Sequence, residues 1–277
     1  MFLAARPHTA SLPFAATLLG VPYDRTASFR SGARFGPAAI RWASQSIESY
    51  SPVLDRDLEE IAFTDRGDLE VEHLSPETMV EAVAGEVAAG AGLPVLLGGE
   101  HTVTVGAVRA LAARHPDLHV LVLDAHLDLR EEFEGSRWSH ACVTRRLVDA
   151  TGWERVAALG IRSGTRDEFE AARALLAVER RLRIGGEVWS RLEGLPLYVS
   201  IDIDVLDPSS APGTGNPEPA GPTASDLFDL LRVLRPLRVV GVDVVEVAPP
   251  HDPSGRTAVL AATLVREALL TWGGAPR

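Results

Sequence analysis

Residues 119–130 read HVLVLDAHLDLR, a short apolar run that changes abruptly into alternating ionisable residues. The apolar run predicts a buried β-strand over His119–Leu123. Asp124, His126 and Asp128 follow it at a spacing of two, and alternate side chains of an extended chain lie on one face. We therefore expect three possible metal ligands to lie side by side at the carboxyl end of this strand.

Other apolar runs of the chain also lead into ionisable residues. Three further predicted strands share this feature: Leu93–Leu97 before His101, Leu197–Ile203 with Asp202 and Asp204, and Val239–Val247 with Glu246. In an open parallel sheet, ligands bind beyond the carboxyl ends of the strands. These residues are therefore candidates for a single site.

Helical patterns alternate with the predicted strands. Two more strands are predicted over Phe14–Val21 and Arg155–Ile161, and helices are predicted from Gly36 and over Ser75–Ala89, Thr102–Arg114, Arg166–Val178, Ala224–Leu234 and Thr257–Thr271. This alternation is typical of a mostly parallel sheet with helices on both faces. We expect residues 1–277 to form one domain with a three-layer α/β/α fold.

Composition excludes several classes of function. The net charge of −11 argues against a nucleic-acid-binding protein, which needs a basic face. All 27 basic residues are arginines, so no lysine is available for a Schiff base or a Walker A loop. Cys142 is the single cysteine, and we interpret it as a small buried apolar residue rather than a nucleophile. The absence of disulfides fits a cytoplasmic protein, and no segment is long and apolar enough for a transmembrane helix.

Charge balance predicts two metal ions. Four aspartates this close together would repel one another and take up protons unless cations compensate them. Two divalent ions would balance the four negative charges, whereas one would leave the site strongly negative. Carboxylate and imidazole ligands suit manganese, iron or zinc, and the excess of oxygen donors favours manganese. A pair of such ions can share a water and lower its pKa.

At these motifs the chain resembles the ureohydrolases, the family of arginase, agmatinase and their relatives. The resemblance runs from about Leu18 to Glu267 and rests on four motifs: Gly98-Gly-Glu-His101, Asp124-Ala-His-Leu-Asp128, Ser200-Ile-Asp-Ile-Asp204 with Val-Leu-Asp-Pro208 after it, and Val245-Glu-Val-Ala-Pro249. It implies a sheet of about eight strands, two Mn²⁺ ions per subunit and assembly as a homotrimer or homohexamer.

The resemblance also implies a role for each candidate residue. His101 and Asp128 would bind one manganese ion, His126 and Asp204 would bind the other, and Asp124 and Asp202 would bridge them. A bridging hydroxide would attack the guanidinium carbon of a small cationic substrate and release urea. Asp128 would accept the proton of that hydroxide, His140 would act as a proton shuttle, and Glu246 would hold the guanidinium group.

Several stretches are most similar to agmatinases, which convert agmatine and water to putrescine and urea. They are Ile47–Ser51, Asp128–Arg130, Ser139–Arg146 and Ala211–Gly215. Asn216 stands where the family usually has threonine, which leaves the substrate preference of this chain open. If Arg130 points into the site, it would bind a carboxylate and favour guanidinobutyrate. Aminopropyl-agmatine and arginine are further alternatives within the family.

Three interpretations outside these substrates stay open at this point. A formiminoglutamase-like enzyme would use the same pair of metals without releasing urea. A deacetylase of related fold would use one zinc ion. A non-catalytic scaffold would have no need for the full set of ligands together with His140 and Glu246.

Overall fold

The computed structural model describes residues 1–7 and 14–274. Eight parallel strands form its central sheet in the order β4-β1-β5-β10-β9-β6-β7-β8. The bounds are β1 Ala16–Val21, β4 Phe63–Asp68, β5 Leu93–Gly98, β6 His119–Leu123, β7 Val156–Leu159, β8 Ala177–Glu179, β9 Pro196–Asp202 and β10 Arg238–Val245. A separate antiparallel ribbon pairs β2 (Tyr50–Ser51) with β3 (Arg56–Asp57).

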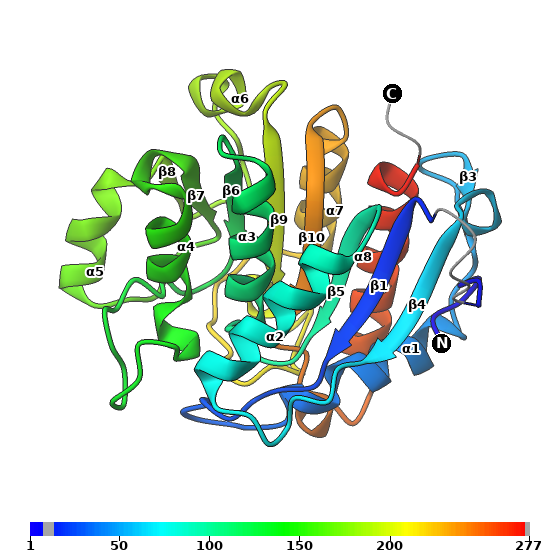
Figure 1. Cartoon of the computed structure of the whole chain (residues 1–277), viewed down its shortest axis with the longest axis horizontal. Coiled ribbons are helices and arrows are strands. Elements are labelled where there is room, and N and C mark those ends of the chain that lie inside the picture. The colour runs from blue at the N-terminus through cyan, green and yellow to red at the C-terminus, as the bar shows by residue number, and fades with distance from the viewer. Residues whose placement is uncertain (8–13, 275–277) are drawn as a thin grey trace.

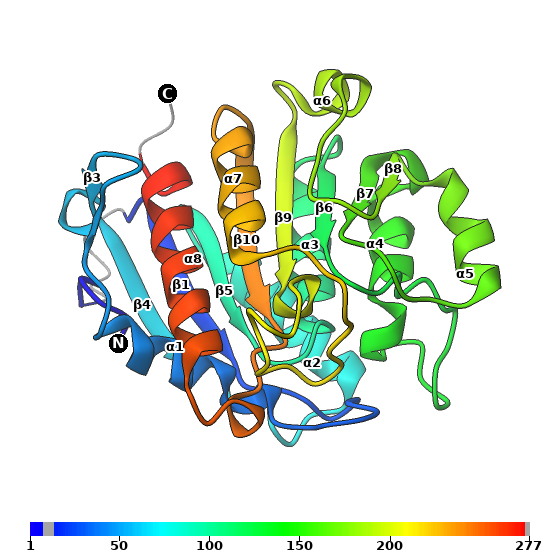
Figure 2. The ribbon, with the colours of Figure 1, turned by 180° about the vertical axis from the view of Figure 1, so that it is seen from behind.

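Helices cover both faces of this sheet. They are α1 Gly36–Ser44, α2 Pro76–Ala89, α3 Val103–Arg114, α4 Val143–Thr151, α5 Arg166–Ala171, α6 Gly186–Leu192, α7 Ala224–Leu234 and α8 Arg256–Trp272. Helices α2, α3 and α4 lie over one face (Figure 1), and α7 and α8 lie over the other (Figure 2). The predicted three-layer α/β/α architecture is confirmed. Among the described residues, no helix is both long and apolar enough to cross a membrane.

Strand β6 shows why the predicted strands are apolar on both sides. Leu121 and Leu123 belong to the hydrophobic cluster on one face of the sheet, and Val120 and Val122 belong to the cluster on the other. Both faces are covered by helices, so the run lacks the polar alternation of a half-exposed strand. Helix α2 begins as predicted, since Ser75 Oγ accepts a 3.2 Å hydrogen bond from the Thr78 amide.

Two predicted elements differ in their bounds. The helix expected over Arg166–Val178 ends at Ala171, and Ala177–Glu179 is the edge strand β8. The Leu176 amide donates to the carbonyl of Val156, so the chain joins the sheet instead of continuing the helix. The last strand ends at Val245 rather than Val247, because Glu246 has a left-handed φ of 61°.

Besides β8, the predicted set lacked strand β4, helices α4 and α6, and the β2–β3 ribbon. Strand β4 lies at an edge of the sheet and contains charged residues and Gly67, so it lacks an apolar run. Helix α6 starts from two consecutive glycines, which oppose helix formation locally. Tertiary packing, rather than local sequence, therefore determines that these elements form.

Candidate metal centre

The carboxyl ends of β5, β6, β9 and β10 lie next to one another, as the sheet order requires. Beyond them lies a cavity of about 440 Å³. All candidate site residues except Asp124 line it: His101, His126, Asp128, Arg130, His140, Asp202, Asp204, Asn216 and Glu246. Asp124 is fully buried beneath the cavity. The fold therefore gathers every residue that the sequence singled out.

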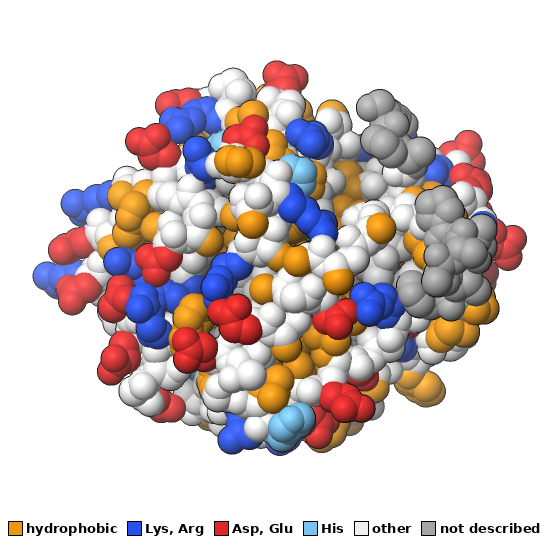
Figure 3. Space-filling view, in the orientation of Figure 1, with side chains coloured by type: hydrophobic (Ala, Val, Ile, Leu, Met, Phe, Trp, Pro, Cys, Tyr) orange, Lys and Arg blue, Asp and Glu red, His pale blue; other side chains and the backbone are white. Residues whose placement is uncertain are grey.

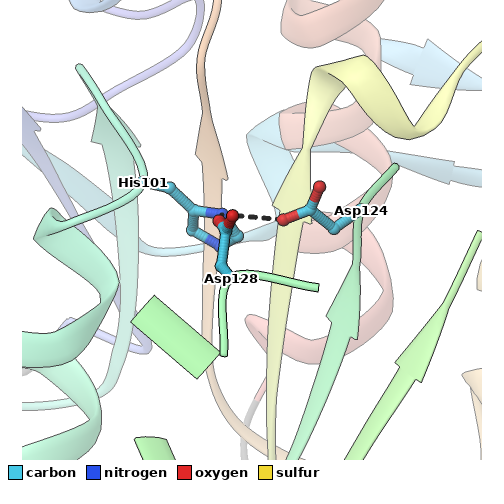
Figure 4. Close-up of side chains that lie close together, drawn as sticks. All are labelled: His101, Asp124 and Asp128. Atoms are coloured by element: carbon cyan, nitrogen blue, oxygen red, sulfur yellow. Dashed lines mark ion pairs between the residues drawn. The ribbon is translucent and has the colours of Figure 1, made fainter. Parts of the chain in front are cut away.

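Asp124 lies at the centre of two groups of possible metal ligands. One group comprises His101, Asp124 and Asp128, and the other comprises Asp124, His126 and Asp204; in each, the ligand atoms lie within 4.8 Å of one another. Figure 4 shows the first group, with His101 Nδ1 3.0 Å from Asp124 Oδ2. In the second group, His126 Nδ1 lies 3.0 Å from Asp204 Oδ2. One carboxylate thus faces both groups, as a bridging ligand would.

Asp202 joins the two groups from β9. Its Oδ2 lies 3.3 Å from His101 Nδ1, and its Oδ1 accepts a 2.8 Å hydrogen bond from the Asp204 amide. It is 3% exposed, so its charge is almost completely removed from water. Its position between His101 and Asp204 suits a second bridging carboxylate.

The backbone that presents these ligands differs from the predicted extended chain. Strand β6 ends at Leu123, and Asp128 has a left-handed φ of 49°. Asp204 lies in the 3₁₀ turn Ile203–Val205 rather than in a strand. The prediction that alternation along a strand aligns the ligands is therefore wrong, because tight turns after the strands bring them together.

The electrostatics of the centre fit bound cations. Burial, followed by repulsion from neighbouring carboxylates, raises the pKa of Asp128 and of Asp202 well above its usual range. Despite its burial, the pKa of His101 is raised by Asp124 and Asp202. His101 Nδ1 and Asp124 Oδ2 are buried and have no hydrogen-bond partner of acceptable geometry. Such orphaned atoms are costly unless a ligand satisfies them, and carboxylates with imidazoles suit divalent transition metals.

A buried hydrogen-bond chain orients the His101 ring. Its Nε2 lies 3.0 Å from Ser200 Oγ, and Ser200 donates a 2.7 Å hydrogen bond to Asp243 Oδ1. Thr104 and Tyr198 donate to Asp243 Oδ2 at 2.8 and 2.7 Å. These hydrogen bonds leave Nδ1 facing the carboxylates. Metal-binding histidines are commonly oriented in this way by a hydrogen bond to their other ring nitrogen. No local pattern around Asp243 predicts these hydrogen-bond partners.

Two further carboxylates lie beside the ligand groups. Glu246 Oε1 accepts a 2.8 Å hydrogen bond from the His101 amide, and burial together with nearby Glu100 raises the pKa of Glu246 to about 8. Glu100 accepts hydrogen bonds from the Thr26 amide and hydroxyl at 2.8 and 2.7 Å. Its burial raises its pKa to about 7. Glu100 was missed because its only local signal is its place in the Gly-Gly-Glu-His motif.

His140 lines the same cavity from the 3₁₀ turn His140–Cys142. Its Nδ1 lies 3.2 Å from Thr26 Oγ1, and its Nε2 lies 3.3 Å from Ser28 Oγ. Burial lowers its pKa to about 4, so the ring is neutral at neutral pH. Two hydroxyls therefore hold a neutral imidazole close to the ligand groups, a contact that sequence spacing could not reveal.

Arg130 and Asn216 lie at the wall of the cavity. Arg130 Nε lies 3.5 Å from Glu168 Oε2, and its guanidinium carbon lies 4.6 Å from the centre of the Phe133 ring. Arg130 is thus already paired with a carboxylate and stacked on an aromatic face. Asn216 is half-buried and lines the cavity from the loop after β9. Contact of either residue with substrate stays a prediction.

Comparisons with known proteins agree with this geometry. The sequence profile of the Arginase family matches residues 14–271. An agmatinase of Bacillus anthracis is 44% identical over 263 residues, covering 92% of this chain and 91% of its own. An N(1)-aminopropylagmatine ureohydrolase of Thermococcus kodakarensis is 40% identical over 253 residues, covering 87% and 86%. The crystal structure of agmatine ureohydrolase of Thermoplasma volcanium superposes with a TM-score of 0.85 at 36% identity, covering 93% and 89%. From its sequence, its fold and the arrangement of its ligand groups, this chain belongs to the arginase family.

Proposed function

We propose that this protein hydrolyses agmatine to putrescine and urea. The chain is a hydrolase that acts on C–N bonds of linear amidines, as its family is. The observation that carries the substrate assignment is the buried carboxylate of Glu246 in the same cavity as both ligand groups. It offers a guanidinium group a charged partner beside the metal centre, and several agmatinases are about 40% identical to this chain.

The proposed cofactor is a pair of Mn²⁺ ions. His101 and Asp128 would hold one, His126 and Asp204 the other, and Asp124 and Asp202 both. When bound, two such ions supply a water acidic enough to attack at neutral pH. The two ligand groups sharing Asp124, and the orphaned buried atoms of His101 and Asp124, support this assignment.

The remaining steps fall to side chains of the cavity. Glu246 would hold the guanidinium group by charge-assisted hydrogen bonds, which also fix the position of its carbon. Asp128 would accept the proton of the attacking water. His140, neutral and held by Thr26 and Ser28, would carry a proton to the departing amine, because an amine leaves only when protonated.

A urea assay of the Mn²⁺-loaded protein tests the substrate. Agmatine, aminopropyl-agmatine, guanidinobutyrate and arginine would be compared by kcat/KM, and agmatine is expected to be best. Preference for aminopropyl-agmatine would favour the function of the Thermococcus kodakarensis relative instead. Turnover of arginine alone would overturn the agmatinase proposal, and turnover without urea would indicate a formiminoglutamase-like reaction.

The metal content of aspartate variants tests the cofactor. Asp124→Asn and Asp202→Asn would each lose at least one metal ion, because each removes a charge that two ions share. Asp229→Asn, on the exposed side of α7, is the matched control and keeps two ions. Full metal occupancy in the Asp124 and Asp202 variants would contradict their bridging roles.

We further propose a cytoplasmic homo-oligomer, a trimer or hexamer, as the resemblance to ureohydrolases implies. Light scattering at several protein concentrations would measure the assembly. A strictly monomeric active enzyme would contradict it.

A further inference from the structure

A long irregular loop forms one wall of the cavity. Residues 207–223 connect the turn after β9 to α7, and Asn216, Pro217 and Glu218 line the cavity. A loop without helix or strand has no regular set of backbone N–H donors for its carbonyls, yet buried backbone carbonyls need hydrogen bonds. Something outside the loop must therefore hold it.

Arg162, in the turn after β7, holds much of this loop. Its guanidinium donates hydrogen bonds to six backbone carbonyls: those of Gly160 at 2.9 Å, Asp204 at 2.9 Å, Val205 at 3.0 Å, Leu206 at 3.3 Å, Glu218 at 2.8 Å and Pro219 at 3.2 Å. In the described part of the chain, no carboxylate forms an ion pair with it. An arginine offers five N–H donors in one rigid plane, so one N–H of Nη2 is shared between two of these carbonyls. Few other side chains could bridge so many acceptors.

Two glycines leave room for this guanidinium and for its turn. A Cβ on Gly221 would lie 2.6 Å from Arg162 Nη2. A Cβ on Gly160 would lie 2.3 Å from Val205 Cγ2, and Gly160 has a φ of 96° that only glycine adopts readily. The chain is therefore built closely around Arg162.

Five of the six acceptors belong to two functional segments, and the sixth, Gly160, lies in the turn that carries Arg162 itself. The carbonyls of Asp204, Val205 and Leu206 lie in and next to the turn that carries the metal-ligand candidate Asp204. Those of Glu218 and Pro219 belong to the loop 207–223, and Glu218 itself lines the cavity. We propose that Arg162 is a positioning residue that couples the Asp204 turn to the substrate-binding loop, so that its loss weakens both metal binding and substrate binding. This inference rests on the proposed function: its metal part on Asp204 as a ligand of the proposed Mn²⁺ pair, and its substrate part on a guanidine substrate.

Arg30 offers a matched comparison. Its Nη2 donates to the Thr214 carbonyl at 2.6 Å, and its Nε donates to the Gly215 carbonyl at 3.2 Å. It thus holds the same loop by the same kind of bond, but within the described residues its hydrogen bonds reach no carbonyl of the Asp204 turn. Weakening Arg30 is expected to affect substrate binding alone.

The test titrates metal-free variants with MnCl₂ by calorimetry and measures KM for the best guanidine substrate. Arg162→Lys and Arg162→Gln are expected to weaken at least one Mn²⁺ site about 10-fold, as loss of partners behind a metal ligand does, and to raise KM several-fold. Arg30→Lys is expected to raise KM with Mn²⁺ affinity unchanged. Arg155→Lys, whose guanidinium bonds the Pro116 carbonyl at the amino ends of the strands, should change neither.

The difference in Mn²⁺ affinity between the Arg162 variants and Arg30→Lys decides the proposal. Circular dichroism of the metal-free proteins first shows which variants fold. Mn²⁺ affinity within twofold of the wild type in both folded Arg162 variants overturns the coupling, whether or not KM changes. If Arg162→Gln does not fold, Arg162→Lys and Gly221→Ala, which displaces the guanidinium, decide by the same criterion. A wild-type protein that hydrolyses no guanidine would refute the proposed function, while the Mn²⁺ titration would still judge the role of Arg162.

Discussion

The backbone amide of His101 donates a 2.8 Å hydrogen bond to Oε1 of Glu246. The Glu246 amide in turn donates to the carbonyl of Gly99 at 2.8 Å. Two hydrogen bonds therefore join the turn after β5 to the residue after β10. A candidate metal ligand and the carboxylate proposed to bind the guanidinium thus keep a constant relative position.

Glu246→Gln is expected to lower kcat/KM about 100-fold. The change removes the charged partner of a buried guanidinium, and truncation of such a pair costs about 2–5 kcal/mol. Metal content should stay at the wild-type value, because glutamine can still accept the His101 amide. Steady-state kinetics and metal analysis of the same preparation measure both. A loss in kcat/KM below threefold would show that Glu246 does not bind the substrate.

His140→Asn is expected to lower kcat about 100-fold while KM changes little, because general acid–base catalysis contributes about 10²–10⁴-fold. Asparagine preserves a hydrogen-bonding side chain beside Thr26 and Ser28 but cannot carry a proton at neutral pH. His73→Asn, at an exposed position, is the control and should match the wild type. Unchanged kcat in His140→Asn would remove the proton shuttle from the mechanism.

The ligands and the sheet could be predicted because their signals are local. An apolar run followed by ionisable residues identifies a buried strand and the residues at its carboxyl end, as at His119–Asp128. The path of the backbone at Asp128 could not be predicted in this way. Its left-handed φ is stabilised by contacts such as the 3.2 Å hydrogen bond from the Arg145 amide to its carbonyl, which depends on the placement of α4.

The residues behind the site could not be predicted, because their partners are distant in the chain. Asp243 acts on His101 through Ser200 and accepts a hydrogen bond from Thr104, 139 residues away, and Arg162 binds carbonyls up to 57 residues away. A single aspartate in a strand or an arginine in a turn has no distinctive local pattern. Strand β8 was missed for a similar reason, since three residues at the edge of a sheet carry too little periodicity to oppose a helical reading.

The metal-free protein is expected to lose stability as pH rises from about 4.5 to about 8. Burial raises the pKa of Glu100 to about 7 and, with Glu100 nearby, that of Glu246 to about 8, against 4.5 for an ordinary glutamate. The folded state therefore binds more protons than the unfolded state in this window, so the free energy of unfolding falls as pH rises. The pKa of His140, lowered from 6.5 to about 4, opposes this trend only below about pH 6.5 and against two raised glutamates. The lowered pKa of Asp124 acts only in more acidic solution.

Urea unfolding of the metal-free protein at pH 5, 6.5 and 8 measures the slope of the free energy of unfolding against pH. The double variant Glu100→Gln, Glu246→Gln should show a smaller slope. Added Mn²⁺ should reduce or reverse it, because protons and cations compete for the same buried carboxylates and imidazoles. Equal stability of the metal-free wild type at pH 5 and pH 8 would contradict the expectation.

Gly99→Ala is expected to prevent folding or to reduce the free energy of unfolding by more than about 3 kcal/mol, a loss typical of severe steric conflicts. A Cβ on Gly99 would lie 1.9 Å from the Tyr23 carbonyl oxygen. That carbonyl accepts a 2.7 Å hydrogen bond from the Glu100 amide, and the Gly99 amide bonds the Val21 carbonyl, so neither segment can move aside cheaply.

Gly85→Ala is the matched control, because a Cβ at that α2 position meets nothing within 4 Å. It should stabilise the protein by about 0.5–1 kcal/mol through helix propensity. Urea unfolding of both metal-free variants measures the contrast, and equal stabilities would show that the Gly98-Gly99 turn tolerates a side chain and that its glycine serves another purpose.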